Sequence, residues 1–181
     1  MKTPYSKVVL VLALFCLFPV IGYAQRAPIN VNLIIDGSSS LAGSRAEIIP
    51  WVNNRLDQIL VDGDRVTVWS AGTVARVIYS GTINSASDRE AVKRSYRELT
   101  GSGATADFSG ALRQAADIPK TSFSYTLLIS ASPESLTSVL SGPYANLLRH
   151  SKVEAFPGWR ALVVGLDIDA RVRSSAAAFM R

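Results

Sequence analysis

Short apolar segments alternate with amphipathic ones along most of this chain. Val31–Ile35 and Ser124–Ser130 contain few polar positions, which is typical of strands buried on both faces of a sheet. Arg65–Ser70 alternates between apolar and polar residues and predicts another strand. A short connection containing Gly72 joins it to a further strand at Val74–Tyr79. So short a connection predicts a hairpin, whose second strand is antiparallel and lies at an edge of the sheet.

Helical periodicity appears between these strands. Apolar residues recur at three- and four-residue spacing in Ser44–Leu60, where Pro50 predicts that the helix either begins late, near Ile48, or kinks. A last buried strand is expected at Arg160–Leu166. Further helices are expected at Asp88–Leu99, Phe108–Asp117, Ser135–Leu140, Tyr144–His150 and Asp167–Arg181. The order of elements predicts an α/β fold, Rossmann-like and doubly wound, with a mostly parallel central sheet, one antiparallel edge strand and helices on both faces.

The first 24 residues differ from the rest and are typical of a secretory signal peptide. A basic start with Lys2 and Lys7 precedes the apolar run Val8–Ile21, and small residues follow at Gly22 and Ala24. We expect cleavage after Ala24, which leaves residues 25–181 as a single domain in the periplasm, at the cell surface or in the medium. Only an uncleaved signal segment would hold the protein at a membrane.

Charge and cysteine content exclude several classes of function. The net charge is +5 at pH 7, but the arginines are scattered, and no aromatic–basic stripe or zinc finger accompanies them. Nucleic acid is therefore not an expected partner. Cys16 is the single cysteine and leaves with the signal peptide, so the mature chain has no disulfide, thiol nucleophile or cysteine-ligated zinc.

The candidate chemistry lies directly after the first buried strand. Asp36, Ser38 and Ser40 form the pattern D-x-S-x-S, which presents hard oxygen groups suited to Mg²⁺, Mn²⁺ or Ca²⁺. In open α/β sheets, ligands bind outside the carboxyl ends of the strands. We expect the loops around Thr105 and Ser130–Glu134 to reach the same edge. The alternative is a polar turn in which Asp36 or Ser38 caps backbone N–H groups.

Three ordered motifs resemble the von Willebrand factor A (vWA) family over residues 29–181. They are the D-x-S-x-S pattern, the segment Gly103–Thr105 before a helix, and the apolar strand Leu127–Ser132. The tail Val163–Asp169 is also similar to a strand and helix start of that family. The resemblance implies a metal-ion-dependent adhesion site at Asp36, Ser38, Ser40 and Thr105, holding Mg²⁺ (or Mn²⁺ or Ca²⁺) and accepting a carboxylate from a partner protein.

The chain departs from the family pattern in ways that make this site incomplete. Ala131 stands where the family has its last acidic residue, and Ser132 stands where the family has glycine. Asp107 or Glu134 could supply the missing charge, although Asp107 also fits a helix N-cap and Glu134 a first-turn acid. The family's final strand and helix are expected to be missing after Arg181. A structural relic without metal is therefore the alternative to a metal site.

The sequence predicts an exported protein-binding or adhesion module rather than an enzyme. Its partner would be an extracytoplasmic or envelope protein, bound at the carboxyl edge of the sheet through Ser39, Ser132 and Trp159. One alternative is a structural or assembly subunit of an envelope complex that needs no metal. A hydrolase of the α/β class is the other alternative, but His150 is the single histidine and no G-x-S-x-G elbow precedes a helix.

Overall fold

The computed structural model describes residues 26–118, 123–140, 144–145 and 151–164. Several expectations concern other residues and so lie outside the described part. They are the signal peptide at 1–24, most of the expected helix Tyr144–His150, His150 itself, and the C-terminal helix Asp167–Arg181. None of the described helices is long and apolar enough to cross a bilayer.

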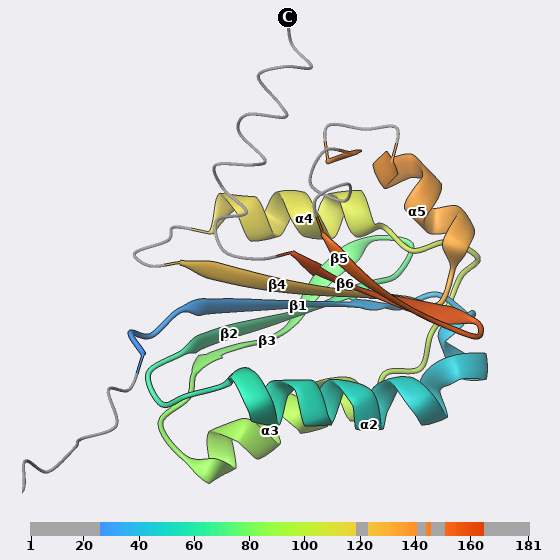
Figure 1. Ribbon diagram of the computed structural model, residues 1–181. Helices are drawn as coiled ribbons and strands as arrows, with labels where there is room; N and C mark the ends of the chain where they lie inside the picture. Colours follow the sequence, from blue (N-terminus) through green and yellow to red (C-terminus); the bar gives the residue numbers. More distant parts are fainter. Residues whose placement is uncertain (1–25, 119–122, 141–143, 146–150, 165–181) are drawn as a thin grey trace, which may run out of the picture.

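A six-stranded sheet with helices on both faces organises the described residues (Figure 1). The strand order is β3-β2-β1-β4-β6-β5. The strands are β1 (Asn30–Asp36), β2 (Arg65–Ala71), β3 (Ala75–Thr82), β4 (Ser124–Ser130), β5 (Lys152–Phe156) and β6 (Trp159–Val164). Helices α2 (Leu41–Ile59) and α3 (Ala86–Arg97) cover one face, and α4 (Phe108–Asp117) and α5 (Pro133–Leu140) cover the other. The expected α/β class with helices on both faces is confirmed.

The three central strands run parallel, so their carboxyl ends meet at one edge of the sheet. Strand β1 pairs in parallel with β2, where Asp36 lies opposite Ala71, and with β4, where Ile35 lies opposite Ile129. We call the edge formed by the carboxyl ends of β2, β1 and β4 the carboxyl edge. The end of β1 at Asp36 therefore lies between two other strand ends, which is where the sequence placed it.

The expectation of a mostly parallel sheet with one antiparallel strand is wrong for the described residues. Strand β3 is antiparallel to β2, as expected, but β6 is also antiparallel to β4, and β5 to β6. The β5–β6 pairing follows from a tight turn at Pro157 and Gly158, where Gly158 has φ +84°. This turn folds β5 and β6 into a hairpin, whereas the sequence predicted only the strand at Arg160–Leu166 and did not predict β5.

Helix α2 begins earlier than expected and continues through its proline. It starts at Leu41 and ends at Ile59, with Pro50 inside and exposed. A proline in a helix interior costs about 3 kcal/mol. The stripe formed by Ile48, Val52 and Leu56 is fully buried on the opposite side, and burying it offsets that cost.

Two apolar cores lie on the two faces of the sheet, and β1 contributes to both. Val31, Leu33 and Ile35 pack into the core under α2 and α3, while Ile34 packs with Leu128 into the core under α4 and α5. Successive side chains of a strand point to opposite faces. A central strand covered by helices on both sides is therefore mostly apolar, and its one buried polar side chain between residues 31 and 35, that of Asn32, donates a hydrogen bond to Thr126 Oγ1 at 3.2 Å.

Candidate functional site

The Asp36 carboxylate joins the end of β1 to the end of β4. Its side chain is fully buried, and Oδ1 accepts a hydrogen bond from the Ser38 N–H at 2.8 Å. Oδ2 accepts from the Ala131 N–H at 2.8 Å and from the Ser132 hydroxyl at 2.5 Å. The bond to Ser38 is the local turn that the sequence allowed as an alternative. The bonds to Ala131 and Ser132 connect residues far apart in the sequence.

The three serines that follow Asp36 differ in exposure. Ser38 is fully buried, and its hydroxyl has no hydrogen-bond partner in the described part of the chain. Ser39 and Ser40 are exposed, and Ser40 precedes α2 without a side-chain capping bond. A buried hydroxyl without a partner is unfavourable, so the Ser38 hydroxyl is the group in this turn that would gain most from an added ligand. Ser39 is exposed, so its predicted contact with a partner stays a prediction.

The loop Thr100–Asp107 lies against the turn after β1. The Ser39 N–H donates to the Gly103 carbonyl at 2.9 Å, and the Ser102 N–H donates to the Gly37 carbonyl at 2.8 Å. These reciprocal bonds hold the two polar segments together at the carboxyl edge. The convergence of the first two motifs, which was expected from strand order, is present in the structure.

Two glycines permit this close approach. A Cβ atom on Gly101 would lie 1.8 Å from the Ser38 carbonyl oxygen, so no other residue fits there without moving the backbone. Gly103 has φ +82°, a conformation that residues with a side chain rarely adopt. The loop leaves Thr105 exposed, so this predicted ligand lies near the turn without being enclosed by it.

The two candidates for the missing acid differ, because Asp107 is held by hydrogen bonds and Glu134 is exposed. Asp107 caps α4, since Oδ1 accepts from the Gly110 N–H at 2.8 Å and Oδ2 accepts from the Ala75 N–H at 3.2 Å. Glu134 is exposed in the first turn of α5. No group of three or more His, Cys, Asp or Glu side chains able to hold a metal ion occurs among the described residues. Asp36 is thus the one predicted carboxylate that lies buried in the turn itself.

Two residues predicted to contact a partner are buried. Ser132 is 1% exposed, and its hydroxyl is used by Asp36, so its prediction as a contact residue is wrong. Trp159 is also 1% exposed, and its prediction as a contact is wrong for a different reason. The β5–β6 hairpin stacks its ring on Phe156 with centroids 4.0 Å apart, and its Nε1 donates to the Glu47 carboxylate at 3.0 Å.

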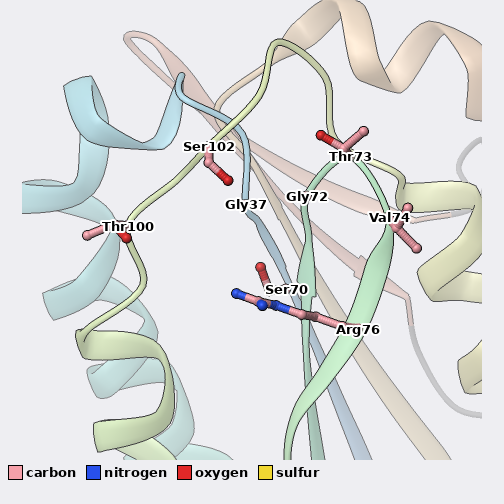
Figure 2. Close-up of a pocket in the computed structure, with 8 residues that line it drawn as sticks. All are labelled: Gly37, Ser70, Gly72, Thr73, Val74, Arg76, Thr100 and Ser102. Atoms are coloured by element: carbon pink, nitrogen blue, oxygen red, sulfur yellow. The ribbon is translucent and has the colours of Figure 1, made fainter.

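A pocket of ≈ 410 Å³ opens beside the turn after β1, and sequence reasoning missed it (Figure 2). It lies between the β2–β3 hairpin and the loop that begins at Thr100. Its lining residues are Gly37, Ser70, Gly72, Thr73, Val74, Arg76, Thr100 and Ser102. Arg76 on β3 lies directly opposite Ser70 on β2. The hairpin was predicted, and its pairing of a basic side chain with a hydroxyl was the signal in the sequence that could have indicated the pocket.

The comparisons with known proteins show a partial similarity to solved structures. No protein-family model matches the chain, and no curated protein matches it. A solved structure named von Willebrand factor type A from Catenulispora acidiphila is similar, with 23% identity and a TM-score of 0.44. The match covers 51% of this chain, which spans 23% of that protein. The name is that of the family that the sequence motifs resemble, and the site described above rests on the residues of this chain.

Proposed function

We propose that this chain is a protein-binding module that docks a partner protein through its carboxyl edge. The observation that carries the proposal is the buried Asp36 carboxylate, which ties the turn after β1 to the end of β4. Around this fixed point, Ser39, Ser40 and Thr105 are exposed. Rigid backbone that presents exposed polar side chains suits recognition, because little entropy is lost when a partner binds.

The resemblance to the vWA family supports the same reading. Members of that family recognise protein ligands at the corresponding edge, and the three motifs of this chain occur in the same order. The signal-like segment at 1–24 suggests that the partner is an extracytoplasmic or envelope protein. The proposal assigns no catalytic step to Asp36, because its two oxygens already accept hydrogen bonds from three buried donors.

A divalent cation fits the donor set only in part. The Ser38 hydroxyl is buried and has no partner among the described residues, and Asp36 Oδ1 accepts one bond, so both could contact an ion. Ser40 and Thr105 would add hydroxyl oxygens from the exposed side. Position 131 is alanine, however, and a single carboxylate provides little charge for Mg²⁺ or Ca²⁺. The cation is therefore an optional addition to the docking edge. When bound, the cation would supply a positive charge for the partner.

Site-specific photo-crosslinking tests the docking proposal. A photoreactive phenylalanine analogue replaces Ser39 or Thr105 on the carboxyl edge, and Asn84 at the opposite end of the sheet in the control. Irradiation in the producing cells should give one discrete adduct from both edge positions and none from Asn84. Equal adduct patterns from all three positions, or no adduct from either edge position, would overturn the proposal.

Calorimetric titration with Mg²⁺ or Mn²⁺ tests the cation separately. One carboxylate should give a dissociation constant of about 1 mM or weaker. Asp36→Ala should abolish the heat, whereas Asp62→Ala, which changes an exposed carboxylate elsewhere, should retain it. If neither the wild type nor Asp36→Ala gives heat, the cation part of the proposal is wrong, and the docking proposal is unaffected.

A further inference from the structure

The pocket beside the carboxyl edge holds a positive charge that nothing in the described part of the chain neutralises. The Arg76 side chain is exposed and makes no ion pair or hydrogen bond with a described residue. Ser70, opposite it, is 3% exposed and lines the same pocket, and its hydroxyl also has no hydrogen bond to a described residue. Figure 2 shows both side chains below the Gly37 and Gly72 backbone. A guanidinium and a buried hydroxyl are therefore both available to a ligand.

Glycine keeps the floor of this pocket open. A Cβ atom on Gly37 would lie 2.4 Å from Ser70 Oγ and 2.9 Å from the Gly72 nitrogen. Any side chain at position 37 would thus occupy the space above the Ser70 hydroxyl. Gly103 does not line the pocket, but a Cβ on it would lie 2.5 Å from Oγ1 of the lining residue Thr73. The space above the Ser70 hydroxyl therefore stays open because position 37 carries no side chain.

The charge of the lining residues selects the class of ligand. Arg76 is the one ionisable residue among them, and the hydroxyls of Ser70, Thr73, Thr100 and Ser102 can all donate hydrogen bonds. A planar guanidinium matches a carboxylate or a phosphate in a bidentate pair. The single positive charge of the Arg76 guanidinium balances the negative charge of a carboxylate, but it leaves a phosphate with excess negative charge. Val74, which is 73% exposed at the rim, adds an apolar contact for methylene groups.

We propose that this pocket binds the carboxylate of an aspartate or glutamate side chain of the partner protein. Arg76 then supplies the positive charge, and the Ser70 hydroxyl donates a hydrogen bond from the floor. The inference rests on the proposed docking function and names the partner chemistry at that edge. It places the electrostatic contact on a side chain of this chain, so that docking needs no metal ion.

Nuclear magnetic resonance titration with small probes tests the pocket without knowledge of the partner. The probes are acetate, N-acetylglutamate N-methylamide, its glutamine counterpart and inorganic phosphate, each added at constant ionic strength. Acetate and the glutamate probe should shift the amide signals of the residues that line the pocket, and the glutamine probe should not. Binding of a lone carboxylate should saturate at millimolar concentrations, since a single charged group supplies little affinity.

Substitutions locate the contact. Arg76→Gln should weaken binding of the glutamate probe by about tenfold or more, because it removes a charge-assisted hydrogen bond. Arg76→Lys should retain part of the affinity, as it keeps the charge and loses the fork. Arg94→Gln changes an exposed arginine on α3 and is the matched control, with unchanged affinity expected. Arg76 is exposed, so its variants should fold, and thermal unfolding of each variant checks this.

Each outcome bears on the proposal. Shifts that depend on Arg76 and on the glutamate carboxylate support it. No shift with either carboxylate, or shifts that persist in Arg76→Gln, would overturn it. Binding of phosphate alone would overturn the carboxylate assignment. If the glutamate probe binds but the edge positions give no crosslinked adduct, the pocket is correct and the docking function is wrong.

Discussion

Replacing Asp36 with alanine should destabilise the protein, because three buried donors share this carboxylate. The Ser38 and Ala131 N–H groups each donate at 2.8 Å, and the Ser132 hydroxyl donates at 2.5 Å. A buried donor left without a partner costs about 1–3 kcal/mol. The Ser132 hydroxyl can rotate to another acceptor, so the two backbone groups dominate. Relief of the buried charge offsets part of this cost, and a net loss of about 2–4 kcal/mol is expected.

Urea unfolding, followed by the fluorescence of the buried Trp69 and Trp159, measures this loss. The wild type, Asp36→Ala and Asp36→Asn are compared in the presence of a chelator, with Asp62→Ala as the exposed-carboxylate control. Asp36→Asn should lower the free energy of unfolding by less than Asp36→Ala, because an amide keeps the shape of the side chain and one acceptor oxygen. It should still be less stable than the wild type, because the amide nitrogen cannot accept a hydrogen bond. Asp62→Ala should change the free energy of unfolding by less than about 0.5 kcal/mol.

A loss below about 0.5 kcal/mol in Asp36→Ala would refute the reasoning, because the carboxylate would then not hold the three donors. The cation makes a separate contribution to the same measurement. A tenfold excess of Mg²⁺ over its dissociation constant stabilises a folded protein by about 1.4 kcal/mol. If the difference between wild type and Asp36→Ala appears only with Mg²⁺, Asp36 is a metal ligand rather than a connection between strands.

Three further predictions concern the elements that support the edge. Asp64→Ala should lower the free energy of unfolding by about 3 kcal/mol in urea titrations, because this buried carboxylate binds Arg26 at 2.6 Å and two backbone N–H groups; an unchanged midpoint would exclude that role. Gly101→Ala should lower the melting temperature in scanning calorimetry and broaden the amide signals of the 100–107 loop, since its Cβ would overlap the Ser38 carbonyl. Gly43→Ala is the control, because a Cβ at position 43 meets no atom within 4 Å. Burial raises the pKa of Tyr96, so the stability contributed by its neutral phenol is present below the unfolded pKa of about 10 and is lost as pH rises through the folded pKa. Ultraviolet titration of the wild type and of Tyr96→Phe should show that this phenol ionises last, and its ionisation near pH 10 would contradict the burial.

The central strands and the helix after the second motif could be predicted because their signals are local. The structure has β4 at Ser124–Ser130 and α4 at Phe108–Asp117, with the bounds that the sequence predicts. Apolar periodicity reports the environment of each residue directly, and burial on both faces leaves few polar positions in a central strand. The position of Asp36 at the carboxyl edge follows from the same pattern.

The contacts within the site could not be predicted, because each depends on residues brought together from distant segments. Ser132 reads as an exposed loop residue, yet its hydroxyl binds a carboxylate 96 positions earlier in the chain. Trp159 follows Pro157 and Gly158 and reads as a loop, but the hairpin turns it onto Phe156. Nothing in the sequence around either residue reports these neighbours.

The sequence by itself determined the α/β class, the parallel central strands and the acidic turn at the end of the first strand. Short-range periodicity and strand order carry that information, because hydrophobic burial acts on each segment separately. Only the tertiary structure decided that the last two strands form an antiparallel hairpin and that Asp36 is held by three donors. It alone placed Thr100 and Ser102 beside the hairpin that carries Ser70 and Arg76, so that these residues line an open pocket, since loop packing depends on where every other segment lies.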